Sequence, residues 1–438
     1  MNRRQFVRYT AMGLGSLSLQ PDLLRSGTRQ LSSVDGQRLN VHIQQLAAFG
    51  RLSSGGVSRV AFSDADLAAR VFVQDLMESA QLRVTIDAAG NIIGRRDGAA
   101  SDLPALMLGS HIDSVPQGGN FDGPVGSLGA IEVAHSLADH DIALRHPIEV
   151  VIFQNEEGGK TGSRAMSGEL DLAELDLVTH SGHSIGDGIG ILGGDPRRLE
   201  TARKQKGDIA AYLELHVEQG GLLEAERIDI GVVEGIVGIV RWTVSIAGFA
   251  NHAGTTPMTD RRDALLAAAR FVETVNRVVT SIDGSQVGTV GQLEVSPGAP
   301  NVIPGHVTLS LEIRDLDMEK IEFVFETIRT DTDALATATG VSFEFEQFYV
   351  SRAAPTDERI RSSIDDAAAQ LDLSSLRMQS GAGHDAQSIA LLAPIGMIFI
   401  PSVGGISHSP EEFSQPQDVT NGANVLLHTL VELDGAFD

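Results

Sequence analysis

Residues 104–126 read PALMLGSHIDSVPQGGNFDGPVG, and this stretch decides the fold class. Residues 104–110 are apolar enough to form a strand that is buried on both faces of a sheet. A Gly-rich turn follows, and residues 125–140 are predicted to form a helix. A buried strand that leads through a polar turn into a helix is typical of an open, mostly parallel α/β sheet.

The same pattern recurs along the chain. Further buried strands are predicted at residues 148–154, 211–217 and 396–402, and polar residues follow each of them. Such sheets place their sites beyond the carboxyl ends of the strands, so these polar residues are expected to converge. The Gly-rich stretch 182–194 lacks the strand and helix context of a nucleotide-binding turn, and we expect a loop there.

A second type of pattern lies between these strands. From residue 238 the chain shows alternating strands and two amphipathic helices in the order βαββαβ, which predicts a ferredoxin-like unit with an antiparallel sheet. We therefore predict a catalytic domain formed by residues 35–237 and 354–438, with a lid and dimerisation domain, residues 238–353, inserted into it.

The composition excludes several classes of function. The 438 residues include 33 Lys and Arg against 58 Asp and Glu, and the resulting net charge of −25 argues against a nucleic-acid partner. Because the chain has no Cys, a metal would have to be held by His and carboxylates. No apolar stretch approaches the roughly 20 residues of a transmembrane helix, and we expect no membrane partner.

Residues 1–34 are predicted to lie outside the fold. Arg3 and Arg4 precede Phe6 and an uncharged stretch over residues 9–20, an order that resembles a twin-arginine export signal. Use of this signal would make the protein periplasmic or exported. The alternative is a disordered basic tail on a cytoplasmic protein.

Candidate metal ligands follow four of the predicted strands. A His in a turn is most often a polar loop residue, and paired acids such as Glu156 and Glu157 are most often solvated, but here they recur at strand ends. Adjacent glutamates can divide the work, one binding a metal and one accepting a proton. The candidate ligands are His111, Asp122, Glu157, His216 and His408.

These five residues suit two divalent ions per subunit. If Asp122 bridges the ions, each gains one His and one further protein ligand, and room remains for a shared water. Since every ligand is a nitrogen or an oxygen, zinc, manganese and cobalt would all be accepted.

Eight motifs in order resemble one enzyme family. They are GSHIDSVPQGGNFDG (109–123), NEEG (155–158) followed by TGSRA, ELHVEQG (214–220), NHAGTTPM (251–258), PGAPNVIPG (297–305), LEIRD (311–315), GAGHDA (381–386) and GISHSPEE (405–412). From about residue 35 to the C-terminus, the chain resembles the amidase, hydantoinase and carbamoylase family. This family includes N-carbamoyl-L-amino acid hydrolase, allantoate amidohydrolase and β-ureidopropionase.

The resemblance implies a metal-dependent amidohydrolase that cleaves a non-peptide C–N bond of a small ureido or amidino carboxylate. It implies the same five ligands, Glu156 as the general base, Asp113 as the residue that orients His111, and a homodimer. It also implies residues that contact the substrate. His252 would polarise the scissile carbonyl, Asn301 and Arg314 would hold the substrate carboxylate, and Gln219 and His384 would lie in the pocket.

One departure from the family leaves the substrate open. Many relatives have a longer stretch with an aromatic residue after the paired glutamates, whereas here Gly159 and Lys160 lead directly into TGSRAM. An exopeptidase or N-acyl-amino acid aminoacylase with the same dinuclear centre is the alternative enzyme. A binding protein that kept the fold without its chemistry is a further alternative, but such a protein normally loses ligands or the base.

Overall fold

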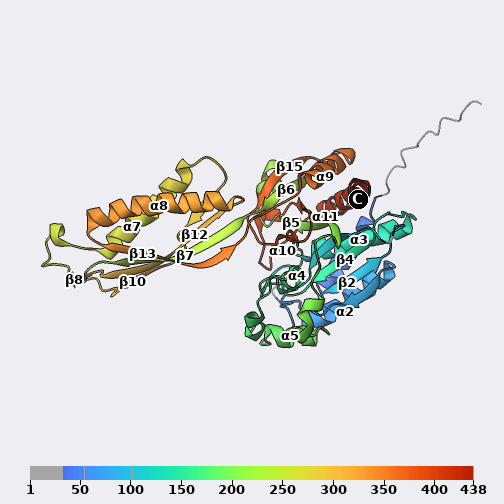
Figure 1. The fold of residues 1–438 in the computed structure, drawn as a ribbon, viewed down its shortest axis with the longest axis horizontal. Coiled ribbons are helices and arrows are strands. Elements are labelled where there is room, and N and C mark those ends of the chain that lie inside the picture. Colours follow the sequence, from blue (N-terminus) through green and yellow to red (C-terminus); the bar gives the residue numbers. More distant parts are fainter. Residues whose placement is uncertain (1–32, 54, 101, 438) are drawn as a thin grey trace, which may run out of the picture. The chain divides into compact units, whose positions relative to one another are not determined.

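The computed structural model describes residues 33–53, 55–100 and 102–437. The candidate export signal at Arg3 and Arg4 lies outside the described residues. Within the described ranges, no helix has both the length and the apolar character needed to cross a bilayer. Two sheets organise these residues, and Figure 1 shows their strands and helices.

The larger sheet has nine strands and is mixed. Its centre is parallel and runs in the order β4 (Ile148–Phe153), β3 (Ala105–His111), β5 (Ile209–Val217) and β16 (Ile395–Ile400). Antiparallel strands β2 (Ile92–Arg96) and β1 (Arg83–Ile86) continue beyond β4. On the other side β6 (Ile230–Ile236) pairs antiparallel with β16, and it also pairs with β14 (Ala354–Pro355) and β15 (Ser375–Ser380).

The prediction of a mostly parallel sheet is confirmed for the centre, whereas the margins are mixed: β1, β2 and β14 are antiparallel and β15 is parallel to β6. Strands β1 and β2 are antiparallel because only five residues, 87–91, connect them, which suffices for a hairpin but not for a parallel crossover. The predicted central strands are confirmed to within two residues at each end. Their parallel arrangement brings four carboxyl ends to one edge of the sheet.

Helices cover this sheet, and two of them approach it through glycines. Leu215 of β5 packs against α3 and α11, where a Cβ at Gly129 or Gly422 would lie 2.9 or 2.7 Å from its methyl groups. The helices of this part are α1 (Gly36–Leu46), α2 (Asp64–Ser79), α3 (Pro124–Asp139), α4 (Thr161–Ser167), α5 (Ile185–Ile191), α6 (Leu222–Glu226), α9 (Glu358–Gln370), α10 (Ala386–Ile389) and α11 (Pro416–Ala436). Short 3₁₀ turns lie at Leu172–Asp176, Pro196–Thr201 and Val403–Gly405.

Helix α5 corrects the expectation of a loop at residues 182–194. Ser184 caps the helix by accepting a hydrogen bond of 3.1 Å from the Asp187 N–H, and Ile185 and Ile189 are buried. Gly188 has no side chain and therefore lets the helix contact the Phe62 ring. Gly188 and Gly194 serve close packing, whereas a Cβ at Gly182 or Gly190 would meet nothing within 4 Å. Composition alone does not distinguish these two kinds of glycine.

The smaller main sheet is antiparallel, with strands that lie between residues 238 and 351. Its order is β10 (Leu293–Ser296), β12 (His306–Asp315), β7 (Gly238–Ala247) and β13 (Ser342–Ser351), and β9 (Val287–Thr289) also pairs with β12. Helices α7 (Ala264–Ser281) and α8 (Met318–Thr339) pack on this sheet (Figure 1). In the core between them, Trp242 stacks on Phe325 with ring centroids 4.2 Å apart.

Two details differ from the predicted order of this unit. The second strand of the predicted βαββαβ order is divided into β9 and β10, and between them the Gln292 N–H donates to Ser310 Oγ at 3.1 Å. A separate two-stranded ribbon forms from β8 (Asn251–His252) and β11 (Val302–Ile303), next to a 3₁₀ turn at Met258–Asp260.

Candidate functional site

The candidate ligands gather at the carboxyl ends of the four central strands. His111 is the last residue of β3, and His216 is the second-last residue of β5. Glu157 follows β4, and His408 follows β16. Asp122 joins them from the turn that leads into α3. The structure therefore brings together all five residues that the sequence singled out.

Asp122 is shared by two groups of ligands. Its Oδ1 lies 3.7 Å from His111 Nε2 and 3.2 Å from His216 Nε2, while its Oδ2 lies 3.2 Å from His408 Nε2. Glu157 Oε2 lies 3.5 Å from the same His408 nitrogen. One group is thus His111, Asp122 and His216, and the other is Asp122, Glu157 and His408. A carboxylate with one oxygen toward each group is suited to bridging two ions.

Backbone contacts orient the histidines. His111 Nδ1 lies 3.1 Å from the Asp113 carbonyl oxygen, and His216 Nδ1 lies 2.9 Å from that of Val217, so each Nε2 faces the site. The Asp113 carboxylate lies 3.6 Å from His111 Nδ1 and also accepts the backbone N–H groups of Glu156 and Glu157, both at 3.2 Å. Asp113 thereby links the turn after β3 to the turn after β4.

Left-handed backbone conformations recur in the turns of the site. Asn155, Lys160, Gln219 and His408 all have φ between 52° and 58°, which costs free energy for residues with a side chain. Such conformations persist where the surrounding contacts fix them, and they are common at functional sites.

Three supporting residues were not found by sequence reasoning. Ser407 Oγ lies 2.8 Å from Asp122 Oδ2 and 2.9 Å from Glu412 Oε2, and Glu412 accepts the backbone N–H of Asp122 at 3.0 Å. Both lie in the quoted GISHSPEE motif, whose position next to His408 was an available signal. Arg59 is fully buried and donates to the Ile112 carbonyl at 2.6 Å and to Asn120 Oδ1 at 3.0 Å. Nothing in its local sequence marks it.

The ionisable groups of the site are strongly perturbed. Burial alone would raise the pKa of Asp122, but His216 and His408 outweigh it and hold this pKa well below the usual range. Burial raises the pKa of Glu156. Burial, together with the charges of Asp122 and Glu156, raises the pKa of Glu157 to about 8. The bond with Asp122 raises the pKa of His408 to about 9.

These residues fit divalent cations. His216 Nε2 is buried and, among the described residues, makes no hydrogen bond; it faces Asp122 Oδ1 at 3.2 Å, so a cation between the two would satisfy both atoms. Asp113, Asp122, Glu156 and Glu157 place an excess of carboxylates in one buried place, which a cation would compensate. The donors are imidazole and carboxylate, as Zn²⁺, Mn²⁺ and Co²⁺ accept.

Metal binding should release protons. Glu157 and His408 have pKa values of about 8 and about 9, so both are largely protonated at pH 7 and must lose their protons to bind a metal. We expect the affinity for divalent ions to rise between pH 7 and 9, roughly tenfold per pH unit for each proton released. Isothermal titration calorimetry in buffers of different ionisation enthalpy measures this release, and binding at pH 7 without it would contradict the expectation.

The predicted substrate residues lie in three places. Gln219 and His384 lie at the metal-ligand cluster, because Gln219 Nε2 donates to Asp122 Oδ2 at 2.6 Å and the rings of His384 and His216 are 4.5 Å apart. His252 and Asn301 lie together on the β8–β11 ribbon, where the Ala253 N–H donates to the Asn301 carbonyl at 3.0 Å.

Arg314 lies at the end of β12. It donates to Glu312 Oε1 at 2.7 Å and to the carbonyl of Gly381 at 2.6 Å, and Gly381 begins the GAGHDA turn that carries His384. Arg314 therefore connects the antiparallel sheet to a turn of the site.

Comparison with known proteins identifies the family of this chain. The sequence profile of Peptidase family M20/M25/M40 matches residues 107–432. The chain belongs to the M20 family, in its hydantoinase/carbamoylase amidase subfamily. An N-carbamoyl-L-amino acid amidohydrolase of Geobacillus stearothermophilus is 40% identical, over 91% of this chain and 99% of the relative. An allantoate amidohydrolase of Bacillus subtilis is 32% identical, over 90% and 96%.

A solved M20 structure agrees with these sequences. A hydantoinase/carbamoylase family amidase from Burkholderia multivorans is 37% identical and superposes with a TM-score of 0.83, covering 91% of this chain and 98% of that one. The family resemblance found in the motifs is confirmed. The predicted enzyme class is confirmed as well, a hydrolase of the N-carbamoyl-L-amino acid amidohydrolase or allantoate amidohydrolase type.

Proposed function

We propose that this M20-family enzyme hydrolyses a non-peptide C–N bond of a small ureido or amidino carboxylate, such as an N-carbamoyl-L-amino acid or allantoate. The observation that carries the proposal is the position of Glu156 beside two ligand groups that share Asp122. The names of the M20 relatives, which act on N-carbamoyl-L-amino acids or allantoate, support this class of substrate.

The metal complement that we propose is two divalent ions per subunit, zinc, manganese or cobalt. His111, Asp122 and His216 would hold one ion, and Asp122, Glu157 and His408 would hold the other. Bound ions of this kind polarise a carbonyl oxygen and lower the pKa of a water molecule.

Glu156 is the proposed general base. Its Oε2 lies 3.9 Å from His111 Nε2, and neither ligand group includes this carboxylate. A carboxylate that binds no metal can accept the proton of the attacking water and return it to the leaving nitrogen. Burial raises the pKa of Glu156, which favours both transfers near neutral pH.

The remaining proposed roles concern the substrate. Arg314 uses two of its five N–H groups on Glu312 and Gly381, so others are available for a substrate carboxylate, with Asn301 as the second donor. His252 would donate to the oxygen that gains negative charge during the reaction, a contact worth about 3 kcal/mol of barrier. Gln219 and His384 would line the pocket beside Asp122 and His216.

We further propose a ferredoxin-like lid and dimerisation role for the antiparallel unit. His252 is exposed on the β8–β11 ribbon, near the exposed apolar side chains of Phe249 and Met258, which are 55% and 74% exposed. A two-fold homodimer would cover such side chains and would let His252 act in the partner's site.

Subunit mixing tests this arrangement. His252→Ala and Glu156→Gln proteins should each be nearly inactive, whereas their mixture should regain roughly a quarter of wild-type activity. Random pairing gives about half heterodimers, each with one intact site of two. Activity after demonstrated subunit exchange is the measurement. A mixture that stays inactive would place His252 in its own subunit's site or outside catalysis.

A substrate panel tests the function itself. The enzyme should be loaded with Mn²⁺ or Zn²⁺ and supplied with N-carbamoyl-L-amino acids, allantoate, N-acetyl-amino acids and dipeptides. Release of ammonia from a carbamoyl compound or from allantoate is the expected result. Turnover confined to acetylated substrates or dipeptides would instead identify an aminoacylase or exopeptidase, and a protein that binds less than about one ion per chain would favour a binding protein.

Export remains a proposal for the N-terminal residues. If Arg3 and Arg4 form a twin-arginine signal, replacing both with Lys should retain the protein in the cytoplasm of a host with that pathway. Fractionation of cells that express either form measures the location of the protein. An unchanged location would favour the alternative, a disordered basic tail.

A further inference from the structure

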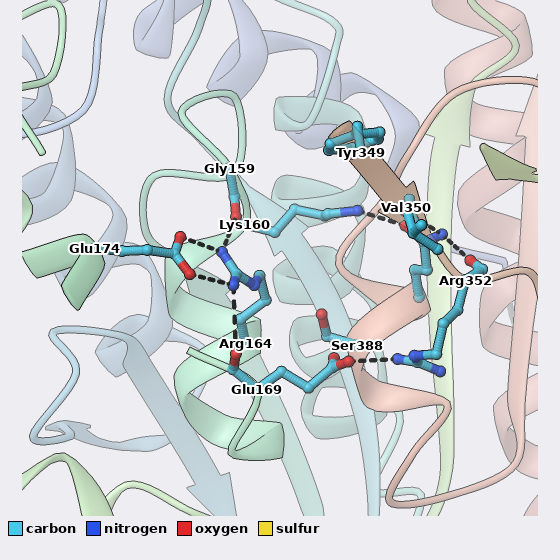
Figure 2. A pocket seen from close by; sticks show the side chains of 11 residues that line it. Gly159, Lys160, Arg164, Glu169, Glu174, Tyr349, Val350, Arg352 and Ser388 are labelled. Carbon is cyan, nitrogen blue, oxygen red and sulfur yellow. Dashed lines mark hydrogen bonds and ion pairs between the residues drawn. The ribbon is translucent and has the colours of Figure 1, made fainter. Parts of the chain in front are cut away.

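A cavity of about 490 Å³ lies where the turn after β4 meets the end of β13. Its charged and aromatic lining is shown in Figure 2 and consists of Lys160, Arg164, Glu169, Glu174, Tyr349 and Arg352. Arg164 binds Glu174 through two hydrogen bonds of 2.7 and 2.5 Å, and Arg352 binds Glu169 at 2.6 Å. Two of the three cations in this lining are therefore neutralised.

Lys160 is the cation that differs. Its Nζ donates to the side-chain oxygen of Gln387, an uncharged amide, and no carboxylate of the described residues lies within ion-pair distance of it. Gln387 is itself fixed, because its Nε2 donates to Ser351 Oγ at 3.1 Å and to the Arg352 carbonyl. An ammonium has three donors, so the Lys160 side chain, extended across the cavity in Figure 2, keeps donors and a full charge for a ligand.

Lys160 also lies at the edge of the candidate metal site. It has a left-handed backbone conformation, with φ of 57°, and its N–H donates to the carbonyl of Glu156 at 2.8 Å. Its ammonium reaches the GAGHDA turn, where a Cβ at Gly383 would lie 3.0 Å from Nζ. The next residue is His384, whose ring contacts His216.

We propose that Lys160 binds a second acidic group of the substrate, so that the preferred substrates are ureido dicarboxylates, N-carbamoyl-L-amino acids with an acidic side chain. This inference rests on the proposed function and names its substrate class. The first carboxylate would be held by Arg314 and Asn301, and the second would enter the cavity at Lys160. In a chain with a net charge of −25, a cation without a carboxylate partner beside a reaction centre is suited to selecting an anion.

The positive charge of Lys160 influences two ionisable groups of the site, Glu156 and His384. Burial raises the pKa of Glu156, and the positive charges of His111 and Lys160 oppose that rise. Burial lowers the pKa of His384, and His216 and Lys160 are among the groups that reinforce the effect.

Matched substrates test the inference. We compare kcat/KM for N-carbamoyl-L-glutamate with N-carbamoyl-L-glutamine, and N-carbamoyl-L-aspartate with N-carbamoyl-L-asparagine, since each pair differs mainly in charge. The wild-type enzyme should prefer the acidic member roughly ten- to a hundredfold, as expected for hydrogen bonds to a charged group. Lys160→Met should bring the ratio to about one, mainly through a higher KM for the acidic member, and Lys160→Arg should retain a preference.

Two further variants sharpen the result. Arg352→Met removes a cation of the same cavity that is already paired, and it should change the ratio less than about twofold. Lys160→Glu should shift the preference toward N-carbamoyl-L-lysine. Far-ultraviolet circular dichroism and metal content establish that each variant is folded.

The contrary outcomes are distinct. A wild-type ratio near one, or a loss shared equally by both members of each pair in Lys160→Met, would overturn the inference and leave Lys160 as a support of its turn. Absence of turnover for every carbamoyl compound and for allantoate would overturn the proposed function, and this inference would fall with it.

Discussion

Glu156→Gln should lower kcat by about 10² to 10⁴ while the protein keeps its full complement of divalent metal. The amide has nearly the shape of the carboxylate but cannot accept a proton from the attacking water. Because neither ligand group includes Glu156, its replacement leaves all the candidate ligands in place, namely Asp122, Glu157 and the three histidines. Single-turnover kinetics on a metal-loaded protein, with metal content measured on the same sample, give both quantities.

The neighbouring residue provides the matched control. Glu157→Gln changes the same functional group one position away, but it removes a ligand from the group of Asp122, Glu157 and His408. This variant should bind one ion normally and the other weakly, and its activity should recover partly at high metal concentration. Equal loss of metal from both variants would contradict the division of roles between the two glutamates.

Asp122→Asn should weaken both metal sites at once. The Asp122 carboxylate is the member common to both ligand groups, and the amide replaces one of its charged oxygens with an N–H donor. That donor would face Gln219 Nε2 or one of the imidazoles, which now contact Oδ2 and Oδ1 at 2.6 to 3.7 Å. Affinity should fall by more than the 10- to 100-fold typical of residues that only support a ligand.

Competition titration with a chromophoric chelator measures both affinities in the Asp122→Asn protein. Ser407→Ala is the control, because Ser407 touches the same Oδ2 at 2.8 Å without belonging to either group. This control should lose about tenfold or less in affinity. Two normal sites in Asp122→Asn would show that Asp122 does not bridge.

The cluster of candidate ligands could be predicted from the sequence because the prediction depends on a single rule of parallel sheets. Parallel strands bring their carboxyl ends to one edge, so His111, Glu157, His216 and His408 could be grouped without knowing any distance. This rule does not predict which marginal strands of the sheet run antiparallel. Those depend on short connections such as residues 87–91, whose effect on strand direction is decided locally.

Other parts of the site depend on contacts that leave no local pattern. Arg59 reaches Ile112 and Asn120 across more than fifty residues of sequence, and its surroundings read only as a polar residue in an apolar stretch. Residues 182–194 were expected to form a loop because they lack the context of a nucleotide-binding turn, whereas Ser184 caps helix α5 there and Gly188 packs closely on Phe62. Lys160 was visible as a departure from the family, but its missing carboxylate partner became visible only in three dimensions.

The place of β16 in the sheet has a consequence for biosynthesis. Although residues 395–400 lie near the end of the chain, they fill the gap between β5 and β6, and His408 emerges from the ribosome later still. From the synthesis of residue 236 until that of residue 395, the nascent polypeptide thus has two unpaired strand edges, which are templates for aggregation. The antiparallel unit, whose strands all precede residue 352, can fold before then. The proposed pair of metal ions could therefore be completed only once residue 408 has been synthesised, and a premature stop codon before residue 395 removes strand β16 together with the candidate ligand His408.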